Sequence, residues 1–258
     1  MCLNCLIFMD RSFGGKFGIN RGKEIECNFG YNFLSAVNVG REGQKIIAEI
    51  QSRKGTHGRY FFKQMFDDEE SFEQLEKYRH FKEGGVSVPP VFKPVRLEGN
   101  KNFVIISDLT EDEKYWVLSR NNPEVDTDEF KKLAKSIPQE TRDKIIQQLI
   151  LACEVAVKPK KDKQGKEIIY QLQGNAFFLA LNSADAADSR VYVGDFGIDV
   201  MERKSTEANE VIKRNIRSAA AFYSWMTGEP FIVPEEYKNM EGDLDEGFKE
   251  ILEYRKFD

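Results

Sequence analysis

Three strand-like runs follow one another early in the chain, and only turn-forming residues separate them. The runs cover residues 34–39, 45–50 and 59–65. Gly40 and Gly43 stand in the first turn, and a Gly-containing turn at 53–58 follows the second run. Short runs joined by brief Gly-containing turns are typical of antiparallel hairpins. The pattern therefore predicts three antiparallel strands.

A change of periodicity follows the third run. Residues 67–82 have helical spacing and acidic residues in the first turn, where the helix dipole favours them, and Gly84-Gly85 ends the pattern. Two further strand-like runs come next, at 86–91 and 102–107. We therefore expect a five-stranded antiparallel sheet with one helix.

The remainder of the chain is mainly helical in pattern. The expected helices cover 128–136, 139–157, a segment from Ser205 or Thr206 (as N-cap) to about residue 226, and 243–254. Strands are expected at 167–172, 176–181 and 191–194, and a solvated basic loop at 158–166. The fold class is thus α+β, with a leader over 1–33, a first lobe over 34–110 and a second over 111–258.

Charge and cysteine content narrow the classes of partner. The formal net charge is −5 without a long block of like charge, which argues against nucleic acid or an anionic membrane as the main partner. We expect a small-molecule or protein partner instead. The chain has four cysteines and two histidines but no second C-x-x-C pair, so reduced thiols fit better than zinc. No apolar run approaches the about 18 residues of a membrane span. A cytoplasmic protein is expected.

Two oxygen-bearing side chains stand at strand or loop ends in the second half. Asp195 opens the triplet Asp195-Phe196-Gly197 after a strand-like run, and Asn175 follows Gly174. One carboxylate and one amide oxygen are suitable Mg²⁺ ligands in a site that also holds phosphates. The alternative is structural, since Asn is common at turns and Asp at strand ends.

A lysine in the third strand-like run is the candidate cation. Lys63 lies among aromatic residues, where an unpaired ammonium is costly to bury, and Glu73 or Glu76 of the following helix could pair with it. An alternating strand whose lysine points to water remains the alternative. Gly40 and Gly43 would allow a backbone to approach an anion closely, although such glycines also serve simple turns.

The order of these residues resembles the protein-kinase-like superfamily, above all its aminoglycoside and choline phosphotransferase branch. The similarity spans about residues 34–200 and includes YFFKQM, the Glu-bearing helix, GGVSVPPVF and FVIISDL. The resemblance implies a bilobal fold with a sheet-rich N-lobe, a mainly helical C-lobe and ATP with Mg²⁺. It implies the following roles: phosphate binding for Lys63, pairing for Glu73 or Glu76, adenine contact for Ser107, Asp108 and Leu109, and metal ligation for Asn175 and Asp195.

The sequence departs from the family at the catalytic loop. Counted back from Asn175, Ile168 and Tyr170 stand where the family has a His and the Asp that orients the acceptor hydroxyl. A tyrosine with a reference pKa of about 10 is a poor base at neutral pH. Three interpretations stay open: a divergent phosphotransferase with an unknown acceptor, a pseudokinase-type binding or regulatory module, and an unrelated α+β protein.

Overall fold

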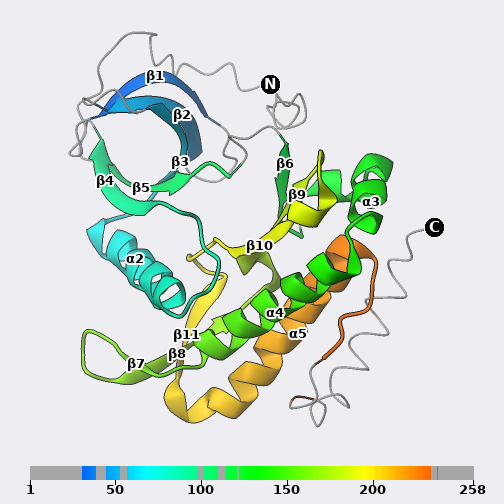
Figure 1. Cartoon of the computed structure of the whole chain (residues 1–258). Coiled ribbons are helices and arrows are strands. Elements are labelled where there is room, and N and C mark those ends of the chain that lie inside the picture. The colour runs from blue at the N-terminus through cyan, green and yellow to red at the C-terminus, as the bar shows by residue number, and fades with distance from the viewer. Residues whose placement is uncertain are drawn as a thin grey trace. The chain divides into compact units, whose positions relative to one another are not determined.

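The structure is a computed structural model that describes residues 31–38, 45–52, 57–97, 101–109, 114–120, 122–233 and 237. Two compact units divide the chain: residues 1–76 with 89–113, and residues 77–88 with 114–258. Most of the predicted leader, Gly40, Gly43 and the predicted helix at 243–254 lie outside the described residues. The fold is mixed α+β, with antiparallel sheets and helices (Figure 1).

The first unit contains a five-stranded antiparallel sheet with the order β1-β2-β3-β5-β4. Its strands are β1 Tyr31–Asn38, β2 Lys45–Ser52, β3 His57–Gln64, β4 Phe92–Leu97 and β5 Lys101–Ser107. Figure 1 shows these strands as one strongly curved sheet. Strand β5, which lies between β3 and β4, carries Phe103, Val104 and Ile105, all buried, so neighbouring side chains cover both of its faces.

Helix α2 (Asp68–Glu83) begins and ends at residues that satisfy its terminal backbone groups. At its start, Glu70 N donates to Asp67 Oδ1 at 2.8 Å, which is the N-cap arrangement. At its end, Val86 N donates to Phe81 O at 3.0 Å, and Gly85 has a φ of 81°. A residue without a Cβ adopts this left-handed conformation readily, so the two glycines end the helix.

The prediction of a strand at 86–91 is wrong. The fifth strand of the sheet is β4, which begins directly afterwards at Phe92. Residues 86–88 pack in the second unit instead: Val193 N donates to Ser87 O at 2.9 Å, and the Val86 side chain is buried. Pro89 and Pro90 have no N–H to donate to a sheet. Strand β4 is itself at the sheet edge, where its Pro94 is tolerated.

The second unit contains two three-stranded antiparallel sheets, β10-β9-β6 and β11-β8-β7. Its elements are β6 Tyr115–Leu118, η1 Pro123–Asp126, α3 Asp128–Lys135, α4 Gln139–Ala156, β7 Lys160–Lys161, β8 Glu167–Leu172, η2 Gly174–Ala176, β9 Phe177–Asn182, η3 Ala186–Asp188, β10 Arg190–Val193, β11 Val200–Lys204, η4 Ser205–Glu207 and α5 Ala208–Thr227. Strands β6, β7 and β11 are not among the strands expected from the sequence.

Helix α5 differs from the sequence prediction at its start and agrees at its end. A 3-10 turn at 205–207 precedes it, and its N-cap is Glu207 without a side-chain capping bond, so Ser205 and Thr206 are not the cap. Gly228 ends the helix with a φ of 71°, and its N–H donates to Ser224 O at 2.9 Å. The predicted buried residues Ile212, Ile216, Ala220 and Tyr223 are all buried.

The core of the second unit lies where α4 and α5 run side by side (Figure 1). Phe177 and Phe222 approach to 5.5 Å between ring centroids. Cys153 of α4 is fully buried as a thiol, and burial raises its pKa far above the ordinary range. Among the described residues, no helix combines the length and the apolar character that crossing a membrane requires.

Candidate functional site

Two backbone hydrogen bonds bring the Asn175 turn and the Asp195 segment together. Asn175 lies in η2, between β8 and β9, and Asp195 follows β10. On one side of the turn Gln173 N donates to Asp199 O at 2.9 Å, and on the other Gly194 N donates to Ala176 O at 3.0 Å. In the second bond, Gly194 directly precedes Asp195 and Ala176 directly follows Asn175. The two predicted metal ligands thus lie on hydrogen-bonded segments.

The two side chains differ in how the protein uses them. Asp195 is half-buried, and its Oδ1 accepts from Gly197 N at 3.2 Å. Asn175 is also half-buried, but within the described part of the chain its amide group makes no hydrogen bond. Other asparagines of the second unit use their side chains in hydrogen bonds: Asn122 and Asn182 accept from backbone N–H groups two residues ahead, and Asn215 bonds to the backbone of β8. An amide left open next to Asp195 is available to a ligand.

The donor set fits Mg²⁺ only in the presence of further oxygen ligands. In the described ranges there is no group of three or more His, Cys, Asp or Glu side chains that could hold a metal. Mg²⁺ is commonly bound by one or two protein oxygens, with substrate phosphates and water completing its octahedron. Asn175 and Asp195 match that pattern, so the site suits a metal that arrives with a phosphate ligand.

One buried asparagine, Asn215, forms two hydrogen bonds with the backbone of β8, the strand before the turn. Asn215 of α5 is fully buried; its Nδ2 donates to Tyr170 O at 3.1 Å, and its Oδ1 accepts from Leu172 N at 2.7 Å. Since β8 also pairs with β11 and with β7, its backbone is fixed on several sides. The turn that carries Asn175 therefore starts from a rigid strand.

Tyr170 is a core residue in this structure. Its side chain is 0% exposed, and its ring lies 5.2 Å from the His80 ring and 6.0 Å from the Phe81 ring, with Lys160 Nζ 5.6 Å from its centroid. Ile168 is buried as well. A phenol enclosed in this way does not reach an acceptor, so β8 places no general base at the site.

Residues in the second half of α2 contact the Asp195-Phe196-Gly197 segment. The Phe196 ring, 1% exposed, lies 5.8 Å from the Tyr78 ring and 6.0 Å from the Phe81 ring. Lys77 Nζ donates to Gly197 O at 3.4 Å. These contacts hold the Phe196 ring and the Gly197 carbonyl, directly after Asp195.

Lys63 lies on β3 of the first unit, directly opposite Val104 of β5. Its neighbour Phe62 is 0% exposed, so alternation places the half-buried Lys63 on the other face of the sheet. Glu73 and Glu76 are both exposed on α2. Which of them pairs with Lys63 stays a prediction.

Ser107 and Asp108, at the end of β5, are tied to their own unit. Ser107 N donates to Val91 O at 3.1 Å, Val91 N donates to Ser107 Oγ at 2.7 Å, and Asp108 N donates to Arg59 O at 3.3 Å. The Asp108 carboxylate, 7% exposed, forms an ion pair with Arg59 at 2.6 Å. An adenine base that contacts this segment would therefore meet its carbonyl oxygens and the N–H of Leu109. The N–H groups of Ser107 and Asp108 are already used within the unit.

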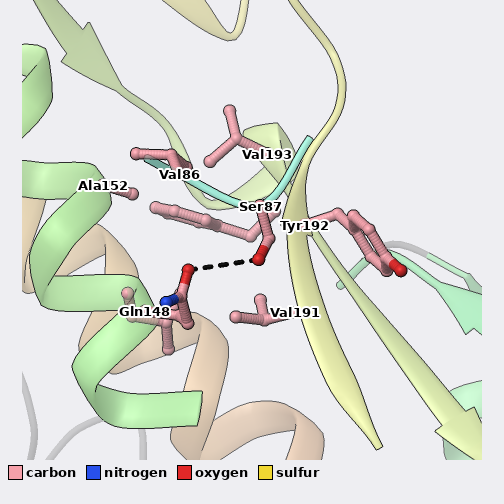
Figure 2. Close-up of a pocket in the computed structure, with 9 residues that line it drawn as sticks. Val86, Ser87, Gln148, Ala152, Val191, Tyr192 and Val193 are labelled. Atoms are coloured by element: carbon pink, nitrogen blue, oxygen red, sulfur yellow. Dashed lines mark hydrogen bonds between the residues drawn. The ribbon is translucent and has the colours of Figure 1, made fainter. Parts of the chain in front are cut away.

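A small pocket in the second unit lies at none of the predicted site residues. It is lined by the loop after α2, by α4, by Phe177 of β9 and by β10, and these residues leave no room inside for a water molecule. Figure 2 shows its one polar link, in which Ser87 Oγ donates to Gln148 Oε1 at 3.1 Å. The surrounding wall is mostly apolar, with Val86, Val191 and Val193 in view (Figure 2). We interpret it as the docking point of the 84–88 loop.

Sequence reasoning missed three residues that contact the site. Asn215 and Lys77 hold the backbone at Tyr170 and Gly197, as described above. The third, Arg120, lies beside Gly174. No local motif marks any of them, because each acts across more than 40 residues of sequence. Asn215 alone had a signal in the sequence: it is a polar residue among the apolar positions of a helix.

Comparisons with known proteins leave the family open. No family model matches the chain, and no curated protein matches it. Among solved structures, it is similar to the Rio2 kinase of Chaetomium thermophilum, solved as an ADP/Mg²⁺-phosphoaspartate complex. The identity is 10%, the TM-score is 0.36, and the alignment covers 90% of this chain and 72% of that one. A TM-score of this size does not establish a common fold, so the function proposed below rests on this chain's own residues.

Proposed function

We propose that the chain is a kinase-like protein that binds a nucleotide together with Mg²⁺ and acts as a divergent phosphotransferase. The carrying observation is the pair of hydrogen bonds that brackets the Asn175 turn, Gln173 N to Asp199 O and Gly194 N to Ala176 O. These bonds join the segments that carry the Asn175 amide and the half-buried Asp195 carboxylate within one compact unit, which supports the proposal. This is the ligand pair that the resemblance to kinase-like phosphotransferases assigns to the metal.

Each remaining part of the proposal has a residue of its own. Asn175 and Asp195 would ligate Mg²⁺, which when bound neutralises charge on the nucleotide phosphates. Lys63, supported by Glu73 or Glu76, would contact the phosphates, and Gly40 and Gly43 would line their approach. Ser107, Asp108 and Leu109 would contact the base through carbonyl oxygens and the Leu109 N–H. The proposed fold is accordingly bilobal, with the five-stranded sheet as the N-lobe.

A second candidate function is a pseudokinase-type binding or regulatory module, and the burial of Tyr170 favours it. A positioned base contributes about 10² to 10⁴-fold in rate. Tyr170 and Ile168 are both buried on β8, so neither of them can supply that contribution. Nucleotide binding needs no base, so both functions share the same metal and phosphate ligands and differ only in turnover.

Calorimetry of a non-hydrolysable ATP analogue, with and without Mg²⁺, tests the shared part. For the wild type we expect binding to be at least about tenfold tighter with Mg²⁺, which corresponds to about 1.4 kcal/mol. Asp195→Ala should remove this Mg²⁺ dependence, and Lys63→Met should weaken binding in both conditions.

Asp185→Ala is the matched control for Asp195→Ala. Asp185 Oδ1 accepts from Ala187 N at 3.1 Å, the same local turn that Asp195 forms with Gly197. The control separates loss of a turn from loss of a metal ligand. Equal affinity with and without Mg²⁺ in the wild type, or equal behaviour of the two Asp variants, would refute the metal site.

A further inference from the structure

Arg120 follows β6 and lies against α5. Its guanidinium carbon is 5.4 Å from the centroid of the Trp225 ring, a cation–π distance. Both residues are half-buried. A cation–π contact supplies no oxygen acceptor, so it does not by itself satisfy the N–H donors of the guanidinium.

The guanidinium also lies next to the turn that carries Asn175. A Cβ built on Gly174 would be 3.6 Å from Arg120 Nη1 and 3.7 Å from Arg120 Cδ. A single methyl group would fit at that distance, but a longer side chain would displace the guanidinium. The absence of a side chain at Gly174 thus lets Arg120 reach the residue directly before the proposed Mg²⁺ ligand.

No described residue accepts a hydrogen bond from the N–H donors of Arg120. Arg190 provides the comparison within the same unit. It also lies over an aromatic ring, at 6.0 Å from the Tyr115 centroid, but its guanidinium is paired with Asp188 Oδ1 at 2.6 Å. Arg120 has the stacking partner without the carboxylate.

We propose that Arg120 binds an oxyanion group, phosphate or carboxylate, of the acceptor molecule. A guanidinium offers a planar fork of donors that matches both groups with two parallel hydrogen bonds. Because the fork lies beside Gly174, an anion held there lies next to Asn175, where the transferred phosphoryl group would be. The acceptor is then a small hydroxyl compound that carries a phosphate or a carboxylate. This assignment of the anion to the acceptor rests on the proposed function.

Trp225 provides a direct readout of the site. In a Trp116→Phe background it is the sole tryptophan, since the chain contains two. The probes are inorganic phosphate and sodium acetate, each titrated against sodium chloride at equal ionic strength. We expect a saturable change in Trp225 emission with at least one probe, and the stronger response tells whether phosphate or carboxylate is preferred.

Three variants in this background decide whether Arg120 causes the response. Arg120→Gln should weaken the binding at least tenfold, and Arg120→Lys, which keeps the charge but lacks the fork, should weaken it less. Arg190→Gln is the matched control and should leave it unchanged. Circular dichroism verifies that each variant is folded. No saturable response, or a response that Arg120→Gln leaves intact, overturns the oxyanion site.

Nucleotide calorimetry on Arg120→Gln separates this proposal from the proposed function. Unchanged affinity for the Mg²⁺-bound ATP analogue, together with lost phosphate binding, supports an acceptor site. A parallel loss of nucleotide affinity would assign Arg120 to the nucleotide phosphates and overturn its role with the acceptor. Saturable phosphate binding in a protein that binds no nucleotide would refute the proposed function and the assignment to an acceptor, while the oxyanion site itself would stand.

Discussion

Asn215 donates a hydrogen bond from its Nδ2 to the carbonyl oxygen of Tyr170, 3.1 Å away, and it does so from a fully buried position on α5. The same side chain accepts from Leu172 N at 2.7 Å. One amide thus satisfies two backbone groups of β8 that would otherwise be buried without a partner. The turn with Asn175 depends on this contact, because it begins at Gly174, only two residues after Leu172.

Asn215→Leu should therefore lower the free energy of unfolding strongly. Each orphaned backbone group costs about 1–3 kcal/mol, and two are left behind. Urea denaturation should show a lower midpoint with an unchanged m-value. Asn209→Leu, at an exposed position on the same helix, is the control and should have little effect. An Asn215→Leu midpoint equal to that of the control would show that β8 does not need the amide.

Tyr170→Phe should leave any ATP turnover unchanged, because the phenol is enclosed in the core and does not reach a substrate. Tyr170→Ala should instead destabilise the protein by about 3–5 kcal/mol, the usual cost of removing a large buried ring. Single-turnover ATP hydrolysis and urea denaturation measure the two effects. Loss of turnover in Tyr170→Phe with normal stability would make the tyrosine catalytic.

Stability should fall as the pH drops below about 6.5, the reference pKa of histidine. Burial lowers the pKa of His80, whose Nε2 is 2.8 Å from Val155 O; Lys160 and Lys158 also lower it, while that hydrogen bond and Glu83 oppose the shift. The unfolded chain then binds more protons than the folded one, so acid favours unfolding until the folded pKa is reached. His80→Gln should flatten this part of the stability profile. An unchanged pH profile in His80→Gln would exclude His80 as the cause.

Gly84→Ala should destabilise the contact between the end of α2 and α4. A Cβ at Gly84 would lie 2.5 Å from Val155 Cγ1 and 2.7 Å from Val155 Cγ2. Overpacking of this kind costs about 1–3 kcal/mol. The double variant Gly84→Ala/Val155→Ala lacks both Val155 methyl groups and so relieves this clash. A double-mutant cycle should therefore give a favourable coupling energy.

Gly85→Ala is the control for this cycle. Its Cβ would meet nothing within 4 Å, and its cost comes from the φ of 81°. Val155→Ala should therefore not rescue it. Equal rescue of both glycine variants would show that the Val155 contact is not the source of the cost.

Local pattern was enough to predict α2, α3 and α4, because each has helical spacing and recognisable ends. Local pattern failed where tertiary contacts determine the secondary structure. Strand β11 (VMERK) is mostly charged in sequence, and only its pairing with β8 makes it a strand. The run at 86–91 is apolar and alternating, yet its carbonyl at Ser87 bonds to Val193 rather than to the five-stranded sheet.

The candidate site divides in the same way. Asn175 and Asp195 were named as a pair from their places at strand or loop ends and from the family resemblance, and the hydrogen bond from Gly194 N to Ala176 O brings their segments together. The contributions of Lys77, Arg120 and Asn215 were not, because each depends on which helix face or loop end lies against the turn. Sequence spacing does not contain that information: Lys77 and Gly197 are 120 positions apart.

The buried thiol of Cys153 has a consequence for measuring how this protein opens. Only the thiolate reacts with disulfide reagents, and burial both raises the pKa of Cys153 and shields its sulfur within α4. In a chain with Cys2, Cys5 and Cys27 replaced by serine, modification of Cys153 must await exposure of the helix pair. The labelling rate of this one sulfur then gives the free energy with which α4 separates from α5, without any denaturant.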